Sequence, residues 1–145
     1  KSGAASLEGS ATLAVAATAP GIFVAADGQT AAALDAPSGR AITAGNPAAP
    51  GALVTLFASG LGPVDPPAAS GAAAASQEPL HRTTQAVSVT VGGQAAELLF
   101  SGLAPGYAGL YQLNVRLPAT LPSGAVSVAI TAGAATSKPA TLHLR

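Results

Sequence analysis

The sequence predicts an all-β protein, an antiparallel β-sandwich of about seven to ten strands. Two observations lead to this class. Apolar and polar side chains alternate with a period of two in several short segments, and Gly, Pro, Asn and Asp turn signals recur about every 8 to 12 residues. Because aromatic residues make up only 3% of the chain, the core must be built from Val, Leu, Ile and Ala. The length of 145 residues fits one domain.

Residues 87–118 carry the clearest strand pattern. Two alternating segments flank Gly92-Gly93. Since glycine takes positive φ angles without steric cost, this pair predicts a two-residue hairpin turn between Val91 and Gln94. The side chains predicted to share one core between two sheets follow the same period of two and are Val87, Val89, Val91, Leu113, Val115, Val128, Ile130, Leu142 and Leu144.

Residues 11–46 are expected to hold short N-terminal strands, packed on the sandwich or exchanged with a neighbouring copy. A small, polar lead of residues 1–10 precedes them and is expected to be flexible. Strands are predicted at residues 11–17, where Leu13 and Val15 share one side, and at residues 30–35 and 41–43. Another apolar segment begins at residues 22–24 and ends at the Asp27-Gly28 turn signal.

Residues 47–145 are expected to form the sandwich itself. The unbroken apolar run at residues 52–59 predicts a strand buried on both faces. Residues 60–84 contain several prolines and an alanine tract without periodicity, which predicts a long surface loop of coil, the best candidate for contact with a partner. Two more strands are predicted, at residues 126–130 and 139–145.

Charge is scarce in this chain. Charged residues make up 8% of the sequence, against about 25% in ordinary proteins, and six acidic residues balance six basic ones. The basic residues are scattered, so nothing resembles the patch that neutralises nucleic-acid phosphates. Low charge instead favours association with other neutral surfaces, such as another copy of the chain.

Cysteine is absent, which excludes disulfides, thiolate metal sites and cysteine nucleophiles. The apolar runs are interrupted well before the roughly 20 residues that a membrane-spanning helix needs. Since the chain begins at Lys1 without a methionine or an apolar signal region, we expect it to be a processed or excised piece of a longer protein.

Several motifs resemble a known family. PGALVTLFASGLGP, VSVTVGGQAAELLFSG and LYQLNVRLP followed by PSGAVSVAITAG resemble the immunoglobulin-like IPT/TIG domains. APGIFVAADGQ, NPAAPGALVTLFASGLGPVDPP and GLAPGYAGLYQLNVRLPATLPSG resemble, more narrowly, the Solibacter-type C-terminal domain of large exported bacterial proteins. The resemblance covers about residues 11–145. It implies an immunoglobulin-like sandwich on an extracellular or cell-surface protein, without enzymatic activity, cofactors or catalytic residues.

Tyr111 allows one comparison with antibody-type domains. In those domains a tyrosine stands two residues before the cysteine of strand F, and its hydroxyl bonds to the backbone of the same corner. Tyr111 stands two residues before Leu113, with leucine in place of the cysteine. The alternative is that Tyr111 is a core aromatic residue with its hydroxyl at the rim.

The residue types used in catalysis and metal binding show no convincing pattern. His81 falls in the predicted loop and His143 on the outward side of the last strand, without ligand spacing to a carboxylate. Asp27 precedes a glycine, so a turn role is favoured over acid–base chemistry. The fragment Gly60-Leu61-Gly62 lacks the helix of a phosphate site, and no Gly-x-Ser-x-Gly motif indicates a serine nucleophile. The sequence therefore predicts no catalytic or metal site.

Glycan chemistry offers one candidate residue. Asn46 and Asn114 are not followed by the Ser or Thr that N-glycosylation requires. Sugar-binding surfaces use exposed aromatic residues, and Tyr107 is the one obvious candidate, as a loop contact. The alternative is that Tyr107 packs over the end of the sandwich.

The sequence thus favours a non-catalytic structural or self-assembling module of an extracellular or cell-surface bacterial protein. Its expected partners are other copies of itself or other domains of a parent protein, and exchange of the strand with Leu13 and Val15 would make it a filament subunit. The alternative function is a recognition or adhesion module that binds a glycan or a protein through its loops.

Overall fold

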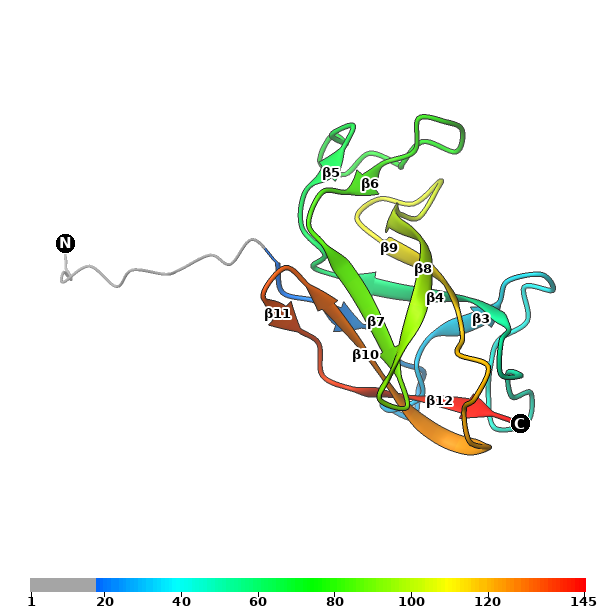
Figure 1. Ribbon diagram of the computed structural model, residues 1–145. Coiled ribbons are helices and arrows are strands. Elements are labelled where there is room, and N and C mark those ends of the chain that lie inside the picture. The colour runs from blue at the N-terminus through cyan, green and yellow to red at the C-terminus, as the bar shows by residue number, and fades with distance from the viewer. Residues whose placement is uncertain (1–17) are drawn as a thin grey trace.

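The computed structural model describes residues 18–145 (Figure 1). The predicted lead and the predicted strand with Leu13 and Val15 lie outside the described residues. All regular structure in residues 18–145 is β, which confirms the predicted class. In chain order the strands are β2 (Gly21–Ile22), β3 (Ala33–Asp35), β4 (Leu53–Ser59), β5 (Val64–Asp65), β6 (Arg82–Thr83), β7 (Val87–Val91), β8 (Gln94–Leu103), β9 (Tyr111–Arg116), β10 (Gly124–Ala132), β11 (Ala135–Thr136) and β12 (Ala140–Leu144).

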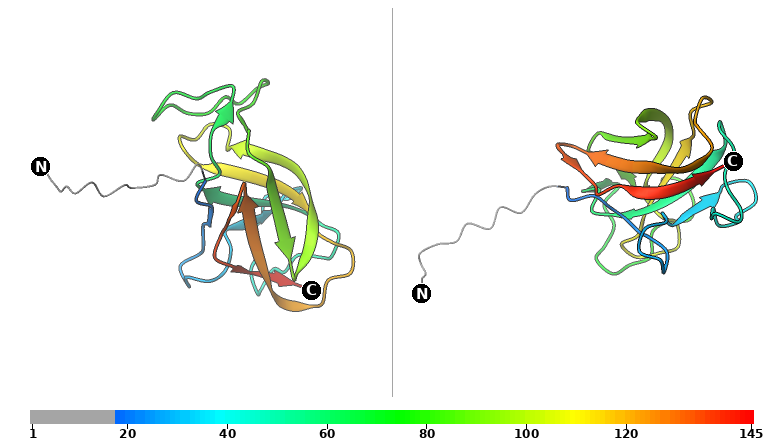
Figure 2. Two further views of the ribbon diagram at one scale, coloured as in Figure 1. Left: turned by 60° about the vertical axis from the view of Figure 1, so that its left-hand side comes forward. Right: turned by 90° about the horizontal axis from the view of Figure 1, so that it is seen from below.

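Strand β8 joins the two layers of the fold. Residues 94–96 pair with β7, and from Glu97 onward the strand pairs with β9. The register shifts between Leu98 and Phe100, and such a bulge lets a strand bend from one sheet into the next. One hydrogen-bonded path therefore runs β11-β10-β7-β8-β9-β4-β2 through antiparallel pairs, and the sheet curls over a central core (Figure 2).

Residues 29–31, which precede β3, join one end of the curled sheet to the last strand, β12. The Ala31 amide donates to the Thr141 carbonyl at 2.8 Å, and the Thr141 amide donates to the Gln29 carbonyl at 2.8 Å. Further along β12, the Ala48 amide donates to the His143 carbonyl at 2.9 Å. Because β10 pairs with the other side of β12, the last strand has backbone partners on both edges.

The predicted hairpin and core are confirmed. Gly92 and Gly93 have φ angles of 58° and 79°, and Val91 pairs with Gln94 across the turn. Of the nine predicted core side chains, Val87 is partly buried and the others are at most 3% exposed. The core also includes Leu56 and Leu117, which lie in the predicted strand patterns, and three large side chains that the pattern did not single out, namely Ile42, Leu61 and Leu121.

The prediction of a coil loop at the surface holds for most of residues 60–84, where only Leu61 and Ala74 are buried, but not for all of them. The segment contains β5 and β6, which pair with each other, and Arg82 of β6 also pairs with Gly102 of β8. The prolines remove backbone donors only at their own positions, so residues between them still pair, and Leu61 enters the core directly after β4.

Three strand predictions need correction in detail. Residues 41–43 form isolated bridges rather than a strand, because the chain reverses at once and Thr43 bridges Asn46. The strand predicted at residues 30–35 is regular only over β3, although bridges extend it to Thr30. Strand β4 is fully buried on one face only: on the other face Thr55 is buried, but Phe57 and Ser59 are partly exposed.

Tyr111 does not make the local corner bond of antibody-type domains. Its hydroxyl donates to the carbonyl of Gly62, which precedes it by 49 residues. The bond therefore ties the start of β9 to the connection after β4, between two segments that are remote in sequence. Burial raises the pKa of Tyr111, so its hydroxyl stays protonated as the donor.

Leu113→Ala should destabilise the domain by about 2–5 kcal/mol, because it opens a cavity in a close-packed core. Leu99, which is 48% exposed on the neighbouring strand, is the matched control, and Leu99→Ala should change stability by less than about 0.5 kcal/mol. Urea unfolding followed by circular dichroism measures both values. Similar losses for the two variants would show that the inward and outward faces are assigned wrongly.

Gly60→Ala should cost about 1–3 kcal/mol or more, since the residue has a φ of 72° and an added Cβ would lie 2.1 Å from the Ala19 carbonyl oxygen. Gly71 is the matched control, because its φ of 76° is similar but nothing lies within 4 Å of an added Cβ. Thermal unfolding should give a clearly larger loss for Gly60→Ala. Equal losses would mean that the contact between Ala19 and Gly60 contributes nothing.

Candidate functional site

The outer face of β4 and β9 brings together polar and aromatic side chains from distant parts of the chain. Alternation along β4 turns Thr55 and Phe57 away from the core. The register between the strands places Asn114 beside Thr55 and Gln112 beside Phe57. The site thus consists of two neighbouring pairs across the sheet, the polar pair Thr55 and Asn114 and the pair of Phe57 with Gln112.

Hydrogen bonds order the polar side chains on this face. The Asn114 Oδ1 atom accepts from the Thr55 hydroxyl at 3.1 Å and from the Gln112 amide nitrogen at 3.1 Å. Within residues 18–145, the Asn114 amide nitrogen and the Gln112 Oε1 atom have no further hydrogen-bond partner in the protein. Both side chains are partly exposed, so a donor and an acceptor remain available to a ligand.

An apolar hollow adjoins this polar pair through Phe57. It has a volume of about 300 Å³ and is lined by Phe23, Ala32, Phe57, Tyr107 and Leu110. Tyr107, the predicted loop contact, is 61% exposed. The side chain therefore stands in the hollow with much of its ring accessible to solvent.

Backbone hydrogen bonds fix the loop that carries Tyr107. The Tyr107 amide donates to the Ala104 carbonyl at 3.1 Å, and the Tyr107 carbonyl accepts from the Ala74 amide at 2.8 Å. Sequence reasoning singled out Tyr107 but missed Phe23 and Phe57. A period of two within residues 52–59, with alternate residues turned outward, would have found Phe57. No sequence signal places Phe23 beside it.

A second surface feature is the groove between the two ends of the curled sheet. It has a volume of about 400 Å³. One wall comes from residues around β2 and the other from the connection between β11 and β12. The lining residues are Pro20, Gly21, Ile22, Val24, Gly28, Lys138, Pro139 and Ala140.

The chain enters the described structure at one end of this groove. The Thr18 hydroxyl is buried and donates to the Ala132 carbonyl at 2.7 Å. The Ala19 amide donates to the Gly60 carbonyl at 2.9 Å. These two bonds hold residues 18 and 19 against the ends of β10 and β4, so the groove begins where the preceding part of the chain is attached.

The structure brings Asp27, Thr30 and His143 together. The Thr30 hydroxyl donates to Asp27 Oδ2 at 2.5 Å and lies 3.3 Å from His143 Nε2. Asp27 Oδ1 accepts from the amides of Gln29 and Thr30, as its predicted turn role requires. These hydrogen bonds lower the pKa of Asp27 to about 2, and the bond from the Thr30 hydroxyl has the largest effect. Thr30 is 8% exposed, so this group is unsuited to nucleophilic attack and instead fastens residues 27–30 to β12.

The side chains of His81, Glu78 and Arg82 make structural contacts. His81 Nδ1 lies 2.6 Å from the Pro66 carbonyl oxygen. Glu78 and Arg82 form an exposed ion pair with an N···O distance of 2.8 Å, and the Arg82 guanidinium lies 5.4 Å from the centroid of the Phe100 ring. Among residues 18–145, no group of three or more histidine and acidic side chains could hold a metal ion, and no helix could cross a membrane.

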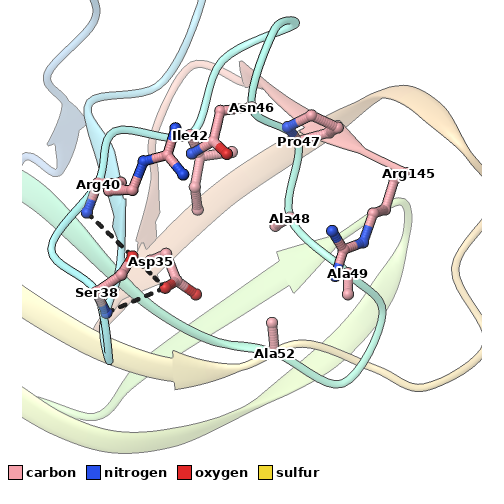
Figure 3. Close-up of a pocket in the computed structure, with 10 residues that line it drawn as sticks. All are labelled: Asp35, Ser38, Arg40, Ile42, Asn46, Pro47, Ala48, Ala49, Ala52 and Arg145. Atoms are coloured by element: carbon pink, nitrogen blue, oxygen red, sulfur yellow. Dashed lines mark hydrogen bonds between the residues drawn. The ribbon is translucent and has the colours of Figure 1, made fainter.

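Figure 3 shows a separate pocket of about 220 Å³ at the end of β3. Arg40 and Arg145 reach into it from opposite sides over the buried side chain of Ile42. Asp35 accepts hydrogen bonds from the backbone amide and the hydroxyl of Ser38, at 3.1 and 2.5 Å. The Asp35 carboxylate therefore orders its own turn. Arg40 and Arg145 are both exposed to solvent.

No family model, curated protein or solved structure matches this chain.

Asp27→Asn should lower the melting temperature at pH 5 and weaken its dependence on pH. The pKa of Asp27 is about 2 in the folded protein against an ordinary value of 3.8. A lowered folded-state pKa stabilises the fold above the unfolded value, and this stabilisation is lost as the pH falls from about 4 toward 2.

Glu78→Gln is the matched comparison for this pH series. The pKa of Glu78 is also about 2, lowered by the hydrogen bond from Arg82, but this exposed pair does not join the ends of the sheet. Scanning calorimetry from pH 2 to pH 6 should show a larger effect for Asp27→Asn. Equal effects would mean that the contact between residues 27–30 and β12 has no special importance.

Proposed function

We propose that this domain is a non-catalytic structural module of an extracellular or cell-surface bacterial protein, and that it self-associates by strand donation. Residues 11–17 of one copy occupy the groove between β2 and the β11–β12 connection of another. The groove is the observation that carries this proposal, because it separates two ends of the sheet and Ile22 and Val24 give part of its mixed polar and apolar lining an aliphatic surface. Immunoglobulin-like sandwiches of the Solibacter type are the family that the sequence motifs favour.

The groove suits the composition of residues 11–17, which read ATLAVAA. Leu13 and Val15 fall on one side of a strand with this sequence, and Ile22 and Val24 offer apolar surface in the groove. Strand addition at the end of a sheet gives an incoming strand backbone hydrogen bonds and also buries its apolar side chains.

The direction of the chain favours donation of residues 11–17 to a neighbouring copy over packing within the same copy. From Val24 to Pro20 the chain follows one wall of the groove, and the bonds of Thr18 and Ala19 hold it at the end. To fill its own groove, the chain would have to reverse immediately before Thr18. Residues 11–19 contain no Gly, Pro, Asn or Asp, the residues that tight reversals prefer.

The surface imposes little electrostatic barrier on association. The formal net charge is zero and charged residues make up 8% of the sequence. Of the groove residues, Lys138 alone is charged, and the segment 11–17 has no charge at all. Contact between copies in a head-to-tail order gives closed rings or open filaments, so the expected assembly is one of these two.

Replacing both Leu13 and Val15 by Asp should weaken self-association of the full chain by at least about a hundredfold, since each buried apolar side chain contributes about 1.5–3 kcal/mol. Thr12→Asp with Ala14→Asp is the matched control, because it adds the same charge on the other side of the strand. Sedimentation velocity over a concentration series measures assembly, and thermal unfolding measures the stability of the fold.

Deletion of residues 1–17 separates donation from packing within one copy. Donation predicts a monomer with an unchanged melting temperature, and added peptide of residues 11–17 should bind to it. A lowered melting temperature without any change in assembly would show that the strand packs within its own copy. If neither quantity changes, the segment has no part in the fold or in assembly.

A further inference from the structure

We propose that the outer face of β4 and β9 binds a neutral polysaccharide chain. The sugar rings would stack on Phe57 and Tyr107, and their hydroxyl groups would hydrogen-bond to Gln112 and Asn114. This site is distinct from the groove of the proposed strand donation, since the hollow with Phe57 and Tyr107 shares no residue with the groove lining. The inference therefore does not depend on self-association.

The two amides define the chemistry of the ligand. Asn114 Oδ1 is already used by two donors, while its amide nitrogen has hydrogens to donate and the Gln112 Oε1 atom can accept. Both groups belong to one β-strand and lie on the same face, two residues apart. A hydroxyl group both donates and accepts, so neighbouring hydroxyls of a sugar ring match this pair.

Aromatic rings lie on both sides of the amide pair. Phe57 is the register neighbour of Gln112 on one side, and Gly102 is its neighbour on the other. The Phe100 ring and the His81 backbone both lie over Gly102: a Cβ added there would be 2.8 Å from Phe100 Cζ and 2.1 Å from the His81 carbonyl oxygen. Sugar rings have apolar C–H faces and polar edges, and this alternation of rings and amides presents a complementary surface.

The hollow gives the aromatic side of the face its shape. Phe23 and Phe57 are contributed by neighbouring strand segments, since the Phe23 amide donates to the Phe57 carbonyl at 3.1 Å. Tyr107 lines the same hollow and is fixed through its backbone by Ala74 and Ala104. A largely apolar depression with a few placed polar groups is typical of small-ligand sites, and here the rings are in place before a ligand binds.

The charges at the borders of this face argue for an uncharged ligand. Next to Asn114 along β9, Arg116 is paired with Glu97 at an N···O distance of 3.6 Å. Next to Phe100, Arg82 is paired with Glu78 by two hydrogen bonds of 2.9 and 2.8 Å. Because both cations already face a carboxylate, the site offers no free positive charge to an acidic polysaccharide.

Affinity gel electrophoresis of the full chain tests the proposal. The gels contain mixed-linkage β-glucan, xylan or galactomannan as neutral polysaccharides and alginate as the acidic comparison. We expect retardation by at least one neutral polysaccharide and none by alginate. Retardation by alginate alone, or by no polysaccharide, would overturn the proposal.

The variants Tyr107→Ser and Gln112→Leu locate the binding site. Each should weaken binding to the retarding polysaccharide at least about fivefold, because one loses a stacking ring and the other a hydrogen bond. Val24→Ser is the matched control, since Val24 is exposed but lines the groove, and it should leave polysaccharide binding unchanged. Thermal unfolding of all three variants checks that each is folded.

Sedimentation velocity of the same variants separates this site from assembly. Tyr107→Ser and Gln112→Leu should leave self-association unchanged. If they abolish self-association and no polysaccharide binds, the face is a protein-docking surface and the glycan proposal is wrong. If a polysaccharide binds equally to all variants, the binding site lies elsewhere and the proposal is also wrong.

Discussion

The pairing of residues 29–31 with β12 is the contact on which the rest of this structure depends. A curled sheet has two ends, and unpaired strand edges expose backbone donors and acceptors to other chains. Here the amides of Ala31 and Thr141 join the segment before β3 to the last strand, while β3 itself pairs with β4. One end of the curl is therefore closed by backbone hydrogen bonds between parts of the chain more than 100 residues apart.

Closure at this end determines where the two proposed binding surfaces lie. The sheet path begins at β11 and ends at β2, and where these strands do not meet, the groove remains. On β2 and the residues after it, alternation then assigns neighbouring side chains to different surfaces. Ile22 and Val24 line the groove, while Phe23 lines the hollow on the outer face. Two independent contacts can thus use the same short segment without competing for a side chain.

The scarcity of charge favours uncharged partners at both proposed binding surfaces. Several ionisable groups are used locally: Asp27 orders a turn through the Thr30 amide, Asp35 orders the turn at Ser38, and Glu78 faces Arg82. Among the described residues, exposed Arg40, Lys138 and Arg145 add only a few scattered charges to a surface that is otherwise mostly apolar or neutral and polar. Such a surface fits neutral partners, either another copy of the chain or an uncharged sugar polymer, better than it fits nucleic acid.

The sequence by itself determined the class of fold, the Gly92-Gly93 hairpin and most of the core, because a period of two assigns every second side chain of a strand to one face. It also identified Tyr107 as an accessible aromatic residue, but not the surface around it. Local pattern carries no information on which strands become neighbours. Only the tertiary structure decided that Phe23 and Phe57 share one hollow, that Tyr111 bonds to Gly62, and that Leu61 is buried. Some of these contacts join segments that are remote in sequence, and others depend on which face of the sheet is covered. Strand pairing across the sheet determines both the neighbours and the covered face.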